Sequence, residues 1–175
     1  AQLAYKRHFP AINWLSSYSL YADTVDTYFN REVASDWSEL RMEAMALLQE
    51  EASLEEIVRL IGIDALSAQD RLKLEVAKSI REDYLQQNSF HEVDTYTSLE
   101  KQYRMLKLVI LFKKEAERAL EAGVYLNDIL NLEVRDKVAR AKYIEEKNIS
   151  RTDEIAVEVK SAIDELISKG GVLNA

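Results

Sequence analysis

Apolar residues recur at steps of three and four along most of the chain, which is the spacing of one face of an α-helix. The clearest example runs from Leu72 to Leu85, where Val76 and Ile80 fall on the same face. No long stretch alternates apolar and polar residues as a half-buried strand would. The sequence therefore predicts an all-α fold: one compact domain over residues 1–175, with about seven or eight helices arranged as helix–turn–helix hairpins.

Capping residues and glycines set the expected helix boundaries. Gly62 and Gly123 each follow an apolar helical stretch, where a helix often ends on a residue with positive φ. Ser53 and Ser67 each precede a helical stretch with an acidic residue three positions later, which is the pattern of an N-terminal capping box. The predicted helices cover approximately residues 10–33, 36–51, 53–61, 67–85, 98–121, 126–130, 133–147 and 150–169.

Composition excludes several classes of protein. The net charge is −8, which argues against sequence-independent binding to nucleic acid, because such binding needs a basic surface. The chain has no cysteine, so disulfides and thiolate chemistry are excluded. No apolar run approaches the ~20 residues of a membrane-spanning helix, so no direct membrane insertion is expected. The chain lacks an initiator methionine, so we expect it to be part of a longer subunit.

Two segments resemble parts of the nucleotide-binding subunits of rotary ATPases. The segment IDALSAQD, at residues 63–70, resembles the DELSEED loop in the C-terminal domain of ATP synthase beta subunits. The segment KRHFPAINWLSSYSLY, at residues 6–21, more closely resembles the catalytic A subunit of archaeal and bacterial V/A-type ATPases. Both occur in the order found in that family. The resemblance is weaker over residues 92–103 and fades towards the C-terminus.

The resemblance implies that the catalytic machinery lies outside this chain. No G-x-x-x-x-G-K-[ST] phosphate-binding loop is present, so the sequence offers no catalytic residue, and no metal site is predicted. ATP or ADP, with Mg²⁺, would be bound by an upstream nucleotide-binding domain. The expected partners are that domain, the B subunits of a hexameric head and the rotor of the central stalk. The parent enzyme would couple ATP hydrolysis or synthesis to H⁺ or Na⁺ transport at the cytoplasmic face of a membrane.

Two phenylalanines acquire a candidate role from the resemblance. In the family, aromatic residues of the C-terminal part hold the adenine base, and the corresponding residues here are Phe9, in RHFPAINW, and Phe90, in QQNSF. Both fall in loops that flank predicted helices, where a side chain can leave the core. The alternative is that both are ordinary core residues. The same resemblance predicts exposed apolar surface around residues 9–14, which the parent subunit would cover.

The turn between two predicted helices is the candidate rotor contact. By resemblance, the contact residues are Asp64, Ala65, Leu66, Ser67 and Asp70. The acidic character of the related loop is reduced, because Ala65, Ala68 and Gln69 stand where it has carboxylates. We therefore expect contact by shape, through Leu66 and its neighbours, rather than charge pairing with a basic rotor. The alternative is a helix hairpin that contacts only solvent.

Two other interpretations of the whole chain remain open at this point. One is a stand-alone helical interaction or scaffold domain with no role in nucleotide binding. The other is the equivalent domain of the non-catalytic B subunit, which the segment HFPAINW disfavours.

A first prediction follows from the missing phosphate-binding loop. The 175-residue chain alone should hydrolyse no ATP, because it has no loop to bind the phosphates and no lysine placed against them. Release of inorganic phosphate by a purified preparation measures this directly. Turnover above that of a buffer blank would contradict the prediction.

Overall fold

The structure, a computed structural model, describes residues 8–15 and 21–173 and contains helices but no strand over that part of the chain. The all-α prediction is therefore confirmed. In chain order the described helices are α2 (Ala22–Glu32), α3 (Trp37–Ile61), α4 (Ala68–Ser79), α5 (Leu99–Glu121), α6 (Leu126–Leu130), α7 (Glu133–Ala139) and α8 (Arg151–Leu173).

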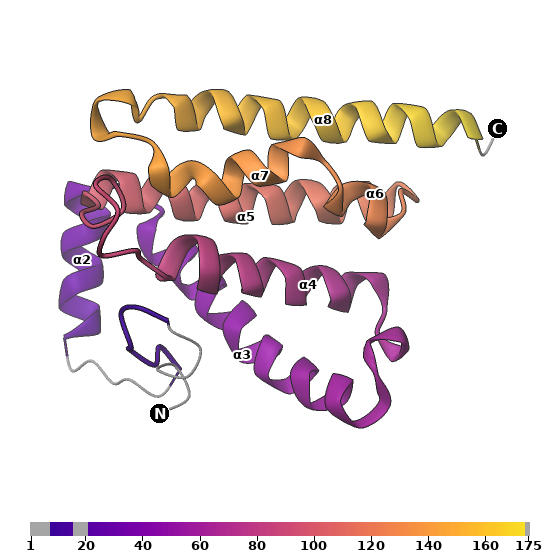
Figure 1. The fold of residues 1–175 in the computed structure, drawn as a ribbon, viewed down its shortest axis with the longest axis horizontal. Coiled ribbons are helices and arrows are strands. Elements are labelled where there is room, and N and C mark those ends of the chain that lie inside the picture. The colour runs from indigo at the N-terminus through magenta and orange to yellow at the C-terminus, as the bar shows by residue number, and fades with distance from the viewer. Residues whose placement is uncertain (1–7, 16–20, 174–175) are drawn as a thin grey trace.

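Helix α5 lies at the centre of the arrangement. Helices α7 and α8 cover one side of it and α4 the other, while α3 crosses beneath α4 and diverges from it (Figure 1). Because α5 has neighbours on both sides, it is buried around much of its circumference. Its buried residues include Met105, Leu106, Leu108, Val109, Ile110, Phe112, Ala116 and Ala119.

The flanking helices each contribute a narrower apolar stripe. On α8, Ile155, Val159 and Ile163 recur every four residues and are buried. On α4, Leu72 and Val76 have the same spacing and are also buried. The opposite faces of both helices are mostly polar. Because the buried apolar residues of α4 and α8 recur every four positions, their spacing in the sequence was enough to predict both helices.

The predicted capping box is confirmed at Ser67, and Ser98 caps α5 in the same way. Ser67 Oγ accepts from Asp70 N at 3.1 Å, and Ser98 Oγ accepts from Lys101 N at 3.1 Å. Gly62 and Gly123 have φ values of +88° and +87°, so both helices end on the residue type that tolerates this backbone best.

The sequence prediction was wrong about the N-terminal helix. A helix was expected over residues 10–33, but α2 begins only at Ala22, and residues 11–13 have no regular structure. Asn13 explains part of the difference, because its Oδ1 accepts from the N–H of Leu15 and favours a turn. Two tyrosines of this region lie largely outside the core, since Tyr21 is 70% exposed and Tyr28 is 50% exposed. Residues 16–20, which belong to the same predicted helix, lie outside the part of the chain that the structure describes.

A second correction concerns α3, which is one continuous helix where two were predicted. The break was expected between residues 51 and 53, because Ser53 opens a capping-box pattern. Instead, the helix continues through Ser53 to Ile61. Serine is only mildly unfavourable inside a helix, so a capping pattern without a glycine or proline does not force an end. Glu51 is also held inside the helix by an ion pair with Arg81.

Two further corrections concern the C-terminal third. The helix expected over residues 133–147 ends at Ala139 and continues as 3₁₀ turns at Arg140–Tyr143 and Glu146–Asn148. Lys142 accounts for this local change, because its buried side chain donates to the backbone oxygens of Glu82 and Gln86. Helix α8 does not stop at Gly170 but runs to Leu173, since glycine costs only about 1 kcal/mol inside a helix.

The packing of α8 on the core generates the second prediction. Ile163→Ala should lower the free energy of unfolding by about 2–5 kcal/mol, because Ile163 is fully buried and its loss leaves a cavity. Val157→Ala, at a position of the same helix that is 65% exposed, is the matched control and should change it by less than about 0.5 kcal/mol. Urea unfolding measures both. Equal effects would contradict the placement of α8.

Candidate functional site

The loop that carries Phe90 is ordered by a buried carboxylate. It follows the π-helical turn η2 (Ile80–Leu85), which continues α4. Asp94 is only 1% exposed, and its Oδ2 accepts from the N–H of Asn88 at 2.6 Å. Asn88 Oδ1 in turn accepts from the N–H of Phe90 at 3.0 Å. The backbone on the N-terminal side of Phe90 is thus fixed by hydrogen bonds, while the Phe90 side chain is 97% exposed.

His91 stabilises the same loop from the other side. Its Nδ1 accepts from the N–H groups of Val93 and Asp94 at 3.1 and 3.3 Å. The ring also packs against Tyr143, with the ring centroids 4.5 Å apart. His91 therefore has a structural role in shaping the Phe90 loop.

The structure brings the two predicted adenine residues onto adjoining segments. The N–H of Gln87 donates to the backbone oxygen of Phe9 at 2.7 Å, so the Phe9 segment is bonded to the Phe90 loop three residues before Phe90. Phe9 is 52% exposed. Neither ring is buried in the core, so the alternative interpretation, that both are ordinary core residues, is wrong. The exposed apolar surface expected around residues 9–14 is also present, since Ile12 is 58% exposed.

His8 is a structural residue that sequence reasoning missed. It is 8% exposed, its Nε2 lies 3.0 Å from the backbone oxygen of Arg81, and its Nδ1 lies 3.1 Å from that of Pro10. Its ring packs on Trp14 with the centroids 5.1 Å apart. The only sequence signal was its position next to Phe9, and a position alone does not reveal a bond to a residue 73 places away.

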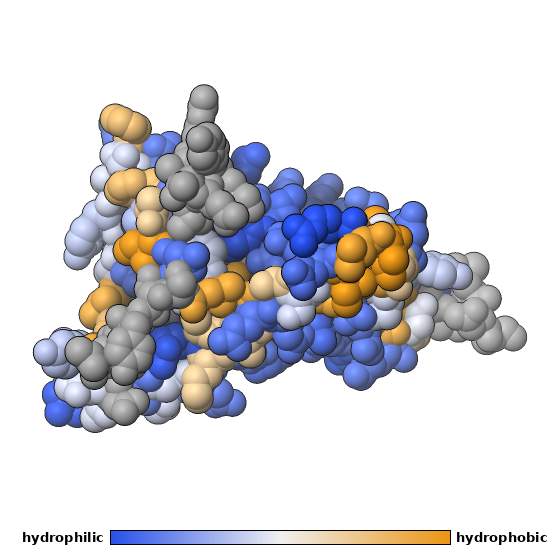
Figure 2. Space-filling view, turned by 90° about the horizontal axis from the view of Figure 1, so that it is seen from below, coloured by the Kyte–Doolittle hydropathy of each residue, from blue (hydrophilic) through white to orange (hydrophobic). Residues whose placement is uncertain are grey.

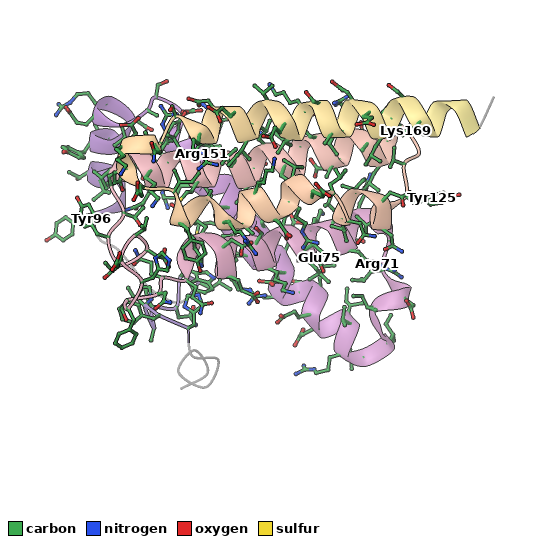
Figure 3. The ribbon with its side chains drawn as sticks, turned by 45° about the horizontal axis from the view of Figure 1, so that its top comes forward. Arg71, Glu75, Tyr96, Tyr125, Arg151 and Lys169 are labelled. Atoms are coloured by element: carbon green, nitrogen blue, oxygen red, sulfur yellow. The ribbon has the colours of Figure 1, made fainter. Side chains whose placement is uncertain are left out.

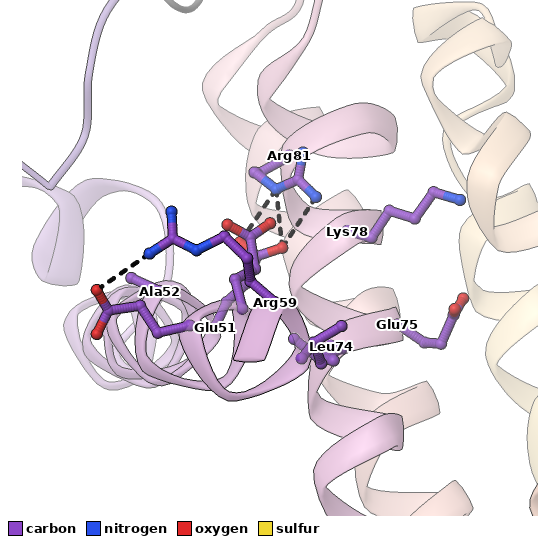
Figure 4. A pocket seen from close by; sticks show the side chains of 10 residues that line it. Glu51, Ala52, Arg59, Leu74, Glu75, Lys78 and Arg81 are labelled. Carbon is purple, nitrogen blue, oxygen red and sulfur yellow. Dashed lines mark hydrogen bonds and ion pairs between the residues drawn. The ribbon is translucent and has the colours of Figure 1, made fainter. Parts of the chain in front are cut away.

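Arg81 joins α3 to the end of α4. Its Nε donates to both carboxylate oxygens of Glu51 at 3.0 Å, and both side chains are largely buried, at 19% and 9% exposed (Figure 4). A cavity of about 530 Å³ opens beside this pair, between the two helices. Lys78 and Glu75 lie on its α4 side, and Arg59 lies on its α3 side (Figure 4).

The turn of the α3–α4 hairpin is stiffened by local polar bonds. Arg71, labelled in Figure 3, donates from Nε to the backbone oxygen of Ile63 and from Nη2 to Asp64 Oδ1, both at 3.2 Å. Ser67 and Asp70 bond reciprocally, because Ser67 Oγ also donates to Asp70 Oδ2 at 2.7 Å. Gly62 lets the backbone leave α3 with positive φ. The connection is therefore a compact turn rather than a slack loop.

The end of the hairpin carries an exposed apolar patch, which we call the tip patch. Its members are Ile57, Leu60, Ile61 and Ile63, at 40%, 79%, 68% and 50% exposed. In Figure 2 it is the orange area over the end of the hairpin, towards the right. Leu66, which was expected to provide the shape of this surface, is only 9% exposed and therefore contributes little to it. The exposed members of the predicted contact set are Asp64, Ala65 and Ser67, with Asp70 half-buried.

Burial shifts the pKa of several groups near the end of α4. It raises the pKa of Tyr84 to about 12, and it raises the pKa of Asp83 against the opposing hydrogen bond from Ser79. Burial lowers the pKa of Lys101, whose Nζ donates to the backbone oxygen of Lys142 at 2.8 Å.

Residues 8–15 and 21–173 contain no cluster of three or more histidine, aspartate or glutamate side chains placed to hold a metal ion. Within the same ranges, none of the helices combines the length and the apolar character that crossing a bilayer requires.

Comparisons with known proteins identify the family. The family model for the C-terminal domain of V and A type ATP synthase matches residues 26–130, a range that includes the hairpin and the Phe90 loop. The chain is 70% identical over 175 residues to the V-type ATP synthase alpha chain of Clostridium botulinum (strain Hall), and equally to that of Clostridium perfringens (strain 13). Both relatives are bacterial.

The extent of these alignments defines which part of the relatives the chain represents. Each alignment covers 100% of this chain but only 30% of the relative, so the chain spans less than a third of the length of the proteins it resembles. The matched family model accounts for more than half of the chain. The all-α fold agrees with it, and the segment at residues 63–70 lies within the matched range. The chain therefore belongs to the family of C-terminal domains of V and A type ATP synthases.

Proposed function

We propose that this chain acts as the C-terminal helical domain of the catalytic A subunit of a V/A-type rotary ATPase. In that subunit it lines part of the adenine pocket and contacts the central rotor. Its partners are the upstream nucleotide-binding domain, the B subunits of the head and the rotor. The assembled enzyme couples ATP hydrolysis or synthesis to H⁺ or Na⁺ transport from the cytoplasmic face of the membrane.

Phe90 carries the adenine half of the proposal. A phenylalanine that is 97% exposed gains nothing from the hydrophobic effect in the chain as described, yet its loop is held by the buried Asp94. Because the backbone that carries the ring is already held in place, stacking of a flat ligand has to restrict only the side-chain torsions of Phe90. Stacking of a base on an aromatic ring contributes about 1–3 kcal/mol. Phe9, bonded through its backbone to Gln87, supplies a second ring from the adjoining segment.

The chain's own residues fit the base of ATP or ADP rather than its phosphates. The two rings offer apolar faces, and no glycine-rich phosphate loop accompanies them. The phosphates and Mg²⁺ are therefore assigned to the upstream domain, which supplies the chemistry of phosphoryl transfer. This division gives Phe9 and Phe90 a role in binding and orienting the nucleotide.

The tip patch and the stiff turn support the rotor half of the proposal. A surface of four aliphatic side chains makes contacts that depend little on orientation, so a turning partner can slide over it without breaking fixed ion pairs. Asp64, Ala65, Ser67 and Asp70 border this surface. The bonds of Arg71 hold the turn rigid, as force transmission requires.

The third prediction tests the adenine contact. Phe90→Ala in the full-length subunit should weaken nucleotide binding by about five- to 150-fold, the equivalent of 1–3 kcal/mol of stacking, without lowering the unfolding midpoint. Tyr96→Ala is the control, because Tyr96 is 71% exposed in the same loop and points away from the body of the molecule (Figure 3). Titration with a fluorescent ADP analogue measures both. Unchanged affinity in Phe90→Ala would remove the proposed role.

The fourth prediction tests the rotor contact. Ile61→Asp should reduce the number of ions transported per ATP hydrolysed in the assembled enzyme, because it places a carboxylate in an apolar contact. The unfolding midpoint should change little, since Ile61 is 68% exposed. Val157→Asp, on the exposed face of α8, controls for an added charge. The proposal fails if Ile61→Asp and the wild type transport equally well per ATP.

A further inference from the structure

We propose that His8 is a positioning residue that fastens the Phe9 segment to the end of α4 and, through Arg81, to α3. The inference rests on the proposed function for its meaning, because it concerns how the adenine-facing rings are held. The hydrogen bond itself, from a buried imidazole to one distant backbone carbonyl, can be tested independently of the proposed function.

The environment of His8 identifies that bond as the anchor of the segment. His8 is 8% exposed, while its neighbours Phe9 and Ile12 are 52% and 58% exposed. The segment therefore has one buried polar side chain within a largely exposed stretch. A buried imidazole needs hydrogen-bond partners, and those of His8 are the backbone oxygens of Arg81 and Pro10.

The π-helical turn makes the carbonyl of Arg81 available. The oxygen of Arg81 accepts from the N–H of Gln86 at 3.0 Å, five residues later, and also from His8 Nε2 at 3.0 Å. A carbonyl oxygen has two lone pairs, so it can serve both donors. The next residue, Gln87, turns its own N–H to the oxygen of Phe9 at 2.7 Å. The Phe9 segment is thus held at two consecutive points.

Arg81 extends this attachment to the other helix of the hairpin. Its guanidinium is bound to Glu51 of α3, so its backbone holds His8 while its side chain holds α3 (Figure 4). A single residue therefore lies between the exposed rings and both helices of the hairpin. A change in the angle between α3 and α4 would act on the same residue that positions Phe9.

The chemistry of the imidazole determines which substitutions preserve the bond. Both facing atoms are carbonyl oxygens, which only accept, so the long-range bond requires a proton on Nε2, and the Pro10 contact is a hydrogen bond only when Nδ1 carries a proton as well. The amide of glutamine places a donor near the position of Nε2. The shorter asparagine places one near Nδ1, towards Pro10. His8→Gln and His8→Asn therefore form a matched pair that separates the two contacts.

Hydrogen exchange in the 175-residue chain provides the test. In His8→Ala the amide of Gln87 should exchange about tenfold faster than in the wild type, because the Phe9 oxygen it bonds is no longer held in place. The amide of Gln86, which bonds within the π turn, should keep its protection and is the internal control. His8→Gln should restore slow exchange at Gln87, and His8→Asn should not. Residue-resolved NMR measures the exchange rates of both amides in the wild type and in the three variants.

Two outcomes would overturn the inference. One is unchanged exchange at Gln87 in His8→Ala, and the other is equal rescue by glutamine and asparagine.

A second measurement, in the assembled enzyme, links the anchor to function: His8→Ala should raise the KM for ATP several-fold with kcat nearly unchanged, and His8→Gln should reverse the effect. If Phe90→Ala raises KM but His8→Ala does not, the adenine role stands and the positioning role fails. If Gln87 loses protection while Phe90→Ala changes nothing, the anchor stands and the adenine role fails.

Discussion

The ion pair between Arg81 and Glu51 is the interaction on which both candidate surfaces depend. An ion pair between exposed side chains contributes about 0–1 kcal/mol. The side chains of Arg81 and Glu51 are only 19% and 9% exposed, and the pair joins α3 to the end of α4. Removal of one partner from a buried pair typically costs about 3–5 kcal/mol, because the other charge stays buried without compensation. The ion pair between Arg81 and Glu51 therefore fixes the end of α4 against α3.

The tip patch and the two phenylalanine rings lie towards opposite ends of α4. At one end, the polar bonds of Arg71 and Ser67 close a short turn beneath an exposed aliphatic surface. At the other end, α4 passes into a π turn whose carbonyl holds His8, and the following loop presents Phe90. The tight packing of α4 on α5 lies between them. Such a packed helix moves as a unit rather than bending locally, which is the property that coupling between two surfaces requires.

Much of this fold could be predicted because it depends on local signals. Gly62, Ser67, Ser98 and Gly123 act within a turn of their own position, so their roles at helix ends are visible in the sequence. The stripes of α4 and α8 follow from spacing alone. The prediction failed where distant partners decide the local structure. Lys142 lies in the 3₁₀ turn that follows α7 and donates to carbonyls some 56–60 residues away, and no local pattern encodes such a bond.

The same distinction applies to the candidate surfaces. Resemblance indicated Phe9 and Phe90, and the structure places both at the surface on adjoining segments. The resemblance did not indicate His8, whose hydrogen-bond partner Arg81 lies 73 residues away. The prediction that Leu66 is the exposed residue of the turn was wrong, because Leu66 is buried. The aliphatic residues that replace it, such as Ile61 and Ile63, look in the sequence like ordinary core positions. Their exposure becomes evident only when the end of the hairpin is seen to extend beyond α5.

The most direct test of the central claim is an experimental structure of the full-length subunit in its assembled head with ADP bound. The measured quantity is the distance between the centroid of the adenine ring and that of Phe90. The account predicts a stacked or edge-on arrangement with the centroids about 4.5–7 Å apart, and Phe9 on the adjoining side of the base. A base bound elsewhere, with Phe90 still exposed to solvent, would contradict it.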